Sequence, residues 1–144
     1  MLATPLHGRA SAAYRDAETF PPARQIVLLY DRAIRHLEDA ADAARERRLD
    51  ARFHHVAKAH AILGALQSCL DHELGGEIAA TLDRLYGHIL HRLMLIALDD
   101  HGAIRQELLP LLRRLREGWT TLADDPAGAT PAQAVATGPA LLCA

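Results

Sequence analysis

The stretch LDHELGGEIAATLDRLYGHILHRL, residues 70–93, decides the fold because it joins the end of one predicted helix to the start of the next. Its glycine pair, Gly75-Gly76, can adopt the positive φ angles that a helix C-terminus and a tight turn require. Glu77 follows in the first turn of the next helix, where unpaired N–H groups and the helix dipole favour a carboxylate. Apolar residues then recur at helical spacing, at Ile78, Leu82, Leu85, Ile89, Leu93 and Ile96. The stretch therefore predicts a helical hairpin.

Helices are predicted on both sides of this hairpin, so that four helices are expected. Pro21-Pro22 marks the start of a first helix that runs to about Arg47, because proline is tolerated in a first helical turn. Asp50 is expected to be the N-cap of the second helix, which ends near Leu70. The third helix is expected over residues 77–98.

The fourth predicted helix follows a turn at residues 99–102. Its apolar row comprises Ile104, Leu108, Leu111, Leu115, Trp119 and Leu122. Pro110 interrupts that row. Because proline cannot donate the backbone hydrogen bond that an α-helix needs at this position, we expect a kink, or a break after a short first segment.

The composition favours an all-α protein. Half of the 144 residues are hydrophobic, but only 4% are aromatic. Leu and Ala dominate, and this favours helices over strands. The length fits one domain, and we place the four helices at residues 21–123. Residues 1–20 and 124–144 lack helical periodicity and are expected to be flexible tails, the second of them rich in Ala, Pro, Gly and Thr.

Charge and cysteine content exclude several classes of protein. The formal net charge of −2 and the interleaving of basic with acidic residues argue against a nucleic-acid-binding surface. Cys69 and Cys143 form no CxxC pair, so no structural disulfide is expected, in agreement with a reducing compartment. No apolar run approaches the roughly 20 residues that span a bilayer. We expect a cytoplasmic protein without membrane insertion.

Nine histidines raise the alternative of a metal- or cofactor-binding bundle. His88 and His91 would share one face of the third helix, and His54, His55 and His60 cluster on the second. However, the sequence contains neither the Glu-x-x-His motif of di-iron bundles nor an HExxH motif. Surface or interface histidines are the preferred interpretation and no metal or cofactor is expected, while the metal-binding bundle stays the alternative.

The sequence also lacks a catalytic constellation. Ser68, Cys69, Asp71 and His72 are close in sequence. Adjacent residues on a helix point apart, however, so these four do not form a nucleophile with its base. Gly75-Gly76 lacks the GxxxxGK[ST] context of a phosphate-binding loop. We therefore expect that the protein is not an enzyme.

Three segments resemble a known family: AYRDAETFPPARQIVLLYDRAI at residues 13–34, KAHAILGALQSCLDHELGGEIAATLDRLYGHILHRL at residues 58–93 and LLRRLREGW at residues 111–119. The family is that of the flagellar secretion chaperone FliS. Leu70-Asp71, Gly75-Gly76 and Leu85-Tyr86 fall in the order and spacing of the family. The resemblance covers nearly all of the predicted bundle.

The resemblance implies an antiparallel four-helix bundle that binds the C-terminal segment of newly made flagellin in the cytoplasm. A chaperone of this kind keeps flagellin from polymerising and delivers it to the export gate of the flagellar type III secretion apparatus. The resemblance further implies that the N-terminal tail closes the client groove through Tyr14. We expect a monomer or a weak homodimer.

Docking of helices into an apolar groove is the recognition mode expected for such a client. Amphipathic helices of a disordered segment would lie along apolar rows that the core does not use. The residues expected to contact the partner are Tyr14, Val27, Tyr30, Ile34, Ile62, Leu66, Tyr86, Leu90 and Met94. For seven of them, an equally open alternative is that the side chains fill the interior of the bundle: Val27, Ile34, Ile62, Leu66, Tyr86, Leu90 and Met94. A self-assembling structural bundle is a third possibility.

Overall fold

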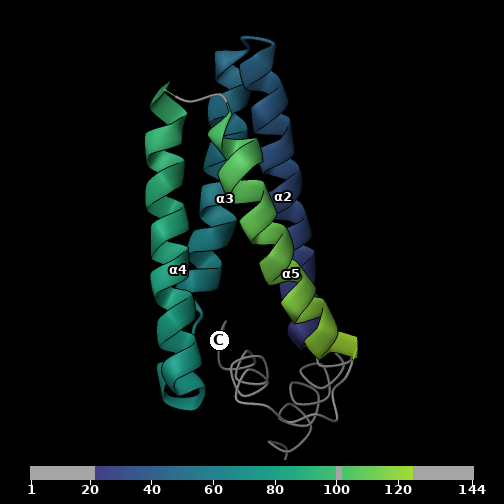
Figure 1. Cartoon of the computed structure of the whole chain (residues 1–144), viewed down its shortest axis with the longest axis vertical. Helices are drawn as coiled ribbons and strands as arrows, with labels where there is room; N and C mark the ends of the chain where they lie inside the picture. Colours follow the sequence, from purple (N-terminus) through teal and green to yellow (C-terminus); the bar gives the residue numbers. More distant parts are fainter. Residues whose placement is uncertain (1–21, 100–101, 125–144) are drawn as a thin grey trace, which may run out of the picture.

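The computed structural model describes residues 22–99 and 102–124, and all regular structure within them is helical. The elements are α2 (Pro22–Arg45), α3 (Leu49–Ser68), α4 (His72–Asp99), the short π-helix η1 (Ile104–Leu108) and α5 (Leu109–Asp124). Successive α-helices run in opposite directions (Figure 1). The predicted all-α helical bundle is confirmed. Among the described helices, none is long and apolar enough to cross a membrane.

The predicted tails fall almost entirely outside the described residues. Residues 1–20 are not described, and of residues 124–144 only Asp124, the last residue of α5, is. Tyr14, the tail residue expected to contact the partner, therefore lies outside the described part of the chain. The division into two tails and a bundle stays a prediction.

The connection between α2 and α3 is a tight turn centred on Arg47. Arg47 has a positive φ of 57°, and the Arg48 N–H donates to the Ala43 carbonyl at 2.8 Å. A left-handed residue followed by a hydrogen bond that spans five residues is the Schellman arrangement that ends many helices. Because this turn is short, α3 begins at Leu49 with Arg48 as its N-cap, and the prediction of Asp50 as N-cap is wrong.

The predicted helical hairpin at residues 70–93 is present, but the second helix starts earlier than expected. Asp71 Oδ1 accepts hydrogen bonds from the backbone N–H groups of Glu73 and Leu74, at 3.0 and 2.9 Å, and thereby caps a helix that begins at His72. Gly76 then interrupts α4 with φ 50° and ψ −126°. Of the glycine pair, only Gly76 has a positive φ, so the glycines kink the helix after it has begun.

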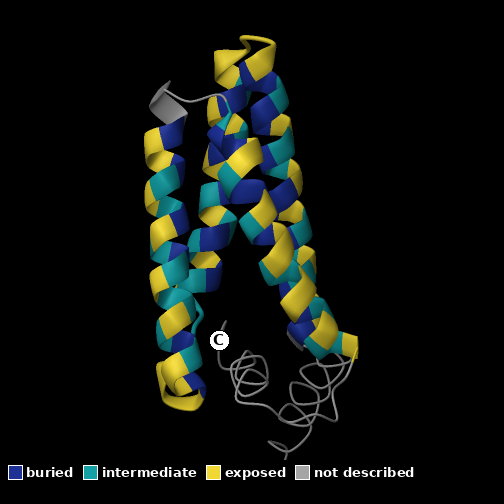
Figure 2. Cartoon of the chain, viewed as in Figure 1, coloured by how far each residue is buried: buried dark blue, intermediate teal, exposed yellow. Residues whose placement is uncertain are grey.

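The core is built around α2, which packs against both α3 and α5, and α4 packs alongside α3 (Figure 2). The buried row of α4 consists of Ala79, Tyr86, Ile89, Leu93 and Ile96. The predicted row is correct at Ile89, Leu93 and Ile96, whereas Ile78, Leu82 and Leu85 are only partly buried. The reason is that α4 diverges from α5 toward the N-terminal end of α4 (Figure 1), so side chains on that face lack a partner helix.

The segment around Pro110 shows how the fourth predicted helix accommodates its proline. The π-helix η1 ends two residues before Pro110, and the Leu109 N–H donates to the Ile104 carbonyl five residues earlier. Proline offers no N–H to the carbonyl four residues before it, and the wider turn just before Pro110 is a single-turn π-bulge within a helix. The expected interruption is therefore present as a π-bulge.

Candidate functional site

An opening lined mainly by apolar side chains lies between α4 and α5. It has a volume of about 460 Å³. Ile78 and Leu82 of α4 form one wall, and Leu115, Trp119 and Leu122 of α5 form the other. We call this the α4/α5 pocket. Pockets of this size, lined mainly by apolar side chains, are typical of ligand-binding sites.

Two local features of the sequence create the α4/α5 pocket. The first is the kink at Gly76, which lies just before the pocket wall formed by Ile78. The second is the π-bulge, whose extra residue turns the apolar row of α5 around the helix axis. As a result, Leu109 and Leu112 are buried, while Leu111, Leu115 and Leu122 are only partly buried. The two helices therefore present leucines to each other across an open space.

Gly118 extends this opening because it has no side chain at a position that lines the pocket. A Cβ atom built at Gly118 would meet no atom within 4 Å. The pocket is therefore open enough at this point to receive a side chain from another molecule or from a substitution.

Trp119 of the pocket lining lies next to a buried pair of tyrosines, Tyr30 and Tyr86. Trp119 is 6% exposed, and Tyr30 and Tyr86 lie behind it in the core at 0% and 1%. The two tyrosine hydroxyls are 2.5 Å apart. Burial raises the pKa of Tyr30 to about 12, opposed in part by hydrogen bonds to Tyr86 and Trp119, and burial also raises the pKa of Tyr86. Both phenols are therefore neutral at physiological pH.

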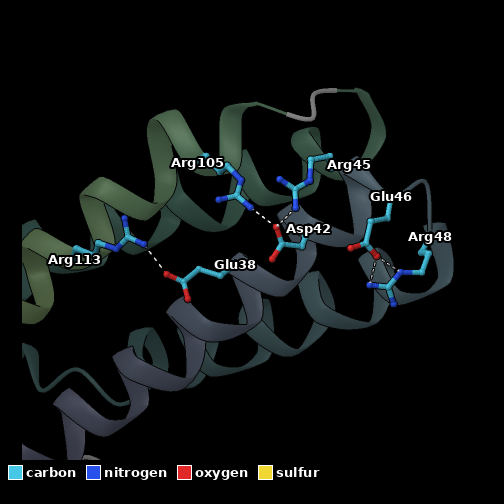
Figure 3. Close-up of polar contacts among 7 residues, drawn as sticks. All are labelled: Glu38, Asp42, Arg45, Glu46, Arg48, Arg105 and Arg113. Atoms are coloured by element: carbon cyan, nitrogen blue, oxygen red, sulfur yellow. Dashed lines mark hydrogen bonds and ion pairs between the residues drawn. The ribbon is translucent and has the colours of Figure 1, made fainter.

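Ion pairs hold α5 and η1 against α2. The pairs are Arg116 with Asp31, Arg113 with Glu38, and Arg105 with Asp42. Figure 3 shows the latter two, in which arginines of the α5 side reach across to carboxylates of α2. All six side chains are at least one-third exposed, so each pair contributes at most about 1 kcal/mol. Together they favour packing of α5 on α2, which leaves its other side free to line the pocket.

A further ion pair joins α4 to η1 near the opposite end of α4 from the pocket. Arg92 donates two hydrogen bonds to the Glu107 carboxylate, at 2.8 and 2.6 Å. The Arg92 guanidinium lowers the pKa of Glu107. This bidentate contact fixes the C-terminal half of α4, whereas the half that carries Ile78 and Leu82 has no such contact with α5 among the described residues.

The eight described residues that the sequence predicts as partner contacts lie outside the α4/α5 pocket. Tyr30 and Tyr86 are buried, and Ile34 and Leu66 are each 8% exposed. Val27, Ile62 and Leu90 are partly buried, while Met94 is 63% exposed. Ile34 lines a smaller pocket of about 310 Å³ between α2 and α5. The role of these eight residues in binding stays a prediction. Tyr30 and Tyr86 are too buried to contact a partner directly and would act by supporting the residues packed around them.

The sequence pattern predicts the apolar residues of the α4/α5 pocket as core residues and therefore does not identify them as a binding site. They are Ile78, Leu82, Leu115, Trp119 and Leu122. Pro110 is the signal that could have found them. A π-bulge before a proline adds one residue, and one residue corresponds to about 100° of rotation around a helix. Applying that rotation moves Leu112 into the core and turns Leu115 and Leu122 partly out of it, in agreement with their burial, whereas Trp119 of the same predicted row stays buried.

The histidines of the metal-binding alternative do not come together as a set. His88 and His91 are exposed on α4. Among the described residues, neither belongs to a group with the spacing of metal ligands, and of the α3 histidines only His55 does, together with His36 and Asp39. The alternative of a bundle built around the histidines of both helices is not supported.

Comparisons with known proteins agree on one family. The family described as "Flagellar protein FliS" matches residues 8–126. The chain is 33% identical over 98 residues to the "Flagellar secretion chaperone FliSB" of Pseudomonas aeruginosa, which covers 68% of this chain and 78% of the relative. It is 31% identical to the "Flagellar secretion chaperone FliS" of Campylobacter jejuni, over 68% of this chain and 77% of the relative. The corresponding protein of Vibrio cholerae is 24% identical, over 68% and 72% of the two chains.

Proposed function

The chain belongs to the FliS family of flagellar proteins, and on this basis we propose that it is an export chaperone whose client is the disordered C-terminal segment of flagellin. The family consists of chaperones and not of enzymes, in agreement with a sequence that has no catalytic motif. The proposal places the protein in the cytoplasm, where it keeps flagellin from polymerising and brings it to the flagellar type III export gate.

The observation that carries this proposal is the apolar lining of the α4/α5 pocket. Leu82 and Leu115 on its two walls belong to different helices and are only partly buried. Such surface is costly to leave in water and is typical of a site that receives apolar side chains of a partner. An amphipathic client helix would place its apolar row between α4 and α5 and act as an additional helix of the bundle.

A single pocket is too small for the whole client contact. Ordering a disordered segment costs about 2–5 kcal/mol or more of the interaction energy, so contacts over a large surface are needed. The partly buried or exposed side chains of Val27, Ile62, Leu90 and Met94 offer further apolar surface on α2, α3 and α4. We propose that the client wraps from the α4/α5 pocket onto these helices.

The N-terminal tail enters the proposal as a competitor of the client. Tyr14 would occupy the client groove in the free chaperone and leave when flagellin binds. Deletion of residues 1–20 should then increase the affinity for the client, and an unchanged affinity would exclude this role for Tyr14.

The proposal is tested by titrating the full chain with a C-terminal fragment of flagellin from the same organism. Calorimetry should give a 1:1 complex, and circular dichroism should show the fragment gaining helix. Absence of heat and of any change in helicity at tens of micromolar would refute the proposal. Light scattering of the free protein distinguishes the expected monomer or weak homodimer from a self-assembling bundle, which would be a stable oligomer without client.

Two helical glycines provide a matched pair of variants for locating the contact. Gly118→Leu would fill the α4/α5 pocket, because a Cβ at Gly118 meets no atom within 4 Å. Gly64→Leu is the control, because Gly64 has the same free space on α3 but does not line that pocket. Only Gly118→Leu should weaken client binding. Equal affinities of the two variants would place the client elsewhere on the bundle.

A further inference from the structure

Two histidines and an aspartate meet across the seam between α2 and α3. His36 and Asp39 are three residues apart on α2 and so share one helix face, while His55 lies on α3. The Nδ1 atoms of His36 and His55 are 3.1 Å apart, and Asp39 Oδ2 is 3.9 Å from His55 Nδ1. One potential ligand atom from each residue lies within 4.8 Å of the other two.

These separations are close to those of ligands that share one metal ion. Two nitrogens bound to a tetrahedral zinc ion at about 2.0–2.1 Å are about 3.3–3.4 Å apart. The observed Nδ1 separation of 3.1 Å therefore requires an opening of only a few tenths of an ångström. Asp39 must move further than the imidazoles, because its Oδ2 atom lies 3.9 Å from His55 Nδ1, and its side chain is 50% exposed, so burial does not prevent that rotation.

The protonation of the pair is also compatible with a metal. Without a metal, one Nδ1 must carry a hydrogen that it donates to the other. Binding of a metal to both Nδ1 atoms would move that hydrogen to Nε2 of the same ring, a change of tautomer that leaves both imidazoles neutral.

We infer that His36, Asp39 and His55 form a site for a divalent transition metal of the zinc class. Two imidazoles and one carboxylate are a ligand set that zinc accepts, with a water molecule completing the tetrahedron. The bound ion would join α2 to α3 and stabilise the folded bundle, since the unfolded chain lacks the assembled site. The inference does not depend on the client of the protein.

The competing explanation is a simple hydrogen bond between two neutral imidazoles, which gives the same 3.1 Å separation. His54 packs against His55 with ring centroids 5.2 Å apart but is not one of the three grouped residues. It therefore provides a neighbouring control that separates a specific site from general affinity of surface histidines for metals.

The test is a titration of the metal-free full chain, made without a histidine tag, with Zn²⁺ in a non-chelating buffer. The variants are His36→Ala, His55→Ala and Asp39→Asn, and the controls are His54→Ala and His88→Ala. Circular dichroism checks the fold of each. Asp39→Asn keeps the helix face and changes a half-exposed side chain, so it tests the site even if an alanine variant unfolds. Co²⁺ absorption gives an independent readout of tetrahedral coordination.

We expect saturable binding of a single zinc ion and a tetrahedral Co²⁺ spectrum. Each ligand variant should weaken the binding by about tenfold or more, because loss of even a supporting partner of a metal ligand commonly costs that much. The controls should retain the affinity of the unchanged chain. Absence of saturable binding, or equal affinities of the Asp39→Asn variant, the alanine ligand variants and the controls, would overturn the inference and leave the hydrogen-bonded pair.

Discussion

The hydroxyl groups of Tyr30 and Tyr86 lie 2.5 Å apart in the core, although the two residues are 56 positions apart in the sequence. Their rings are tilted by 30°, with centroids 6.5 Å apart. Each hydroxyl is desolvated, and a buried polar group without a partner is costly. The pair thus joins α2 to α4.

Replacing either tyrosine of this pair with phenylalanine should destabilise the bundle, and the costs of the two replacements should not be additive. Tyr86→Phe leaves the Tyr30 hydroxyl with a lost partner and should cost about 1–3 kcal/mol, as Tyr30→Phe should. In the double variant neither hydroxyl remains, so the cost should be less than the sum of the two single costs. Urea unfolding of the four proteins measures this coupling. Additive costs would mean that the hydroxyls do not interact.

The same pair predicts a loss of stability in alkali. The pKa of Tyr30 rises in the folded state from its ordinary value of 10.0 to about 12. Because the folded protein holds the proton more tightly, this stabilisation is complete below pH 10 and decreases as the pH rises from about 10 toward about 12. The free energy of unfolding should fall in that range, and it should fall less in the Tyr30→Phe/Tyr86→Phe double variant. The same slope in both proteins would refute the assignment.

The presence of four helices was predictable because apolar spacing and turn residues are local properties of the sequence. The two sites where the prediction failed depend on hydrogen bonds that the spacing does not show. Asp71 caps a helix before the glycine pair, so α4 begins at His72 and kinks at Gly76. The Schellman turn at Arg47 similarly moved the start of α3 from the expected Asp50 cap.

The candidate site was harder to predict because it depends on how far α5 is rotated about its axis and on how far α4 diverges from α5. The sequence identified the apolar residues of the α4/α5 pocket but placed Leu82 and Leu115 in the core, since a regular bundle would bury both. The π-bulge before Pro110 and the divergence of α4 from α5 leave them partly exposed. Family resemblance indicated a client groove, but it could not indicate which apolar row remains open.

Alanine variants of two α5 leucines should distinguish a core residue from a pocket residue. Leu112 is fully buried, and Leu112→Ala should cost about 2–5 kcal/mol of stability. Leu115 is partly buried and lines the pocket, so Leu115→Ala should cost less, about 1–2 kcal/mol, yet weaken binding of the flagellin fragment. Urea unfolding and calorimetry measure the two effects. The opposite order of stabilities would mean that the helix does not shift its register at the π-bulge.

Because α4 is kinked at Gly76, Gly76→Ala should lower the stability of the protein, whereas Gly64→Ala in α3 should raise it. Gly76 combines φ 50° with ψ −126°, a region that residues with a Cβ enter only at a cost of about 1–3 kcal/mol. Gly64 lies in regular helix with free space around its missing Cβ, so Gly64→Ala should stabilise the protein by about 0.5–1 kcal/mol.

The comparison also tests whether the kink shapes the candidate site. Relief of the strain in Gly76→Ala requires α4 to straighten before Ile78, which would change the separation of the pocket walls. The Gly76→Ala variant should therefore lose stability in urea and bind the flagellin fragment more weakly at temperatures where it is fully folded, whereas Gly64→Ala should keep the affinity of the unchanged chain. If Gly76→Ala were as stable as Gly64→Ala, the helix would not be kinked at this residue in solution, and the explanation of the pocket by that kink would fail.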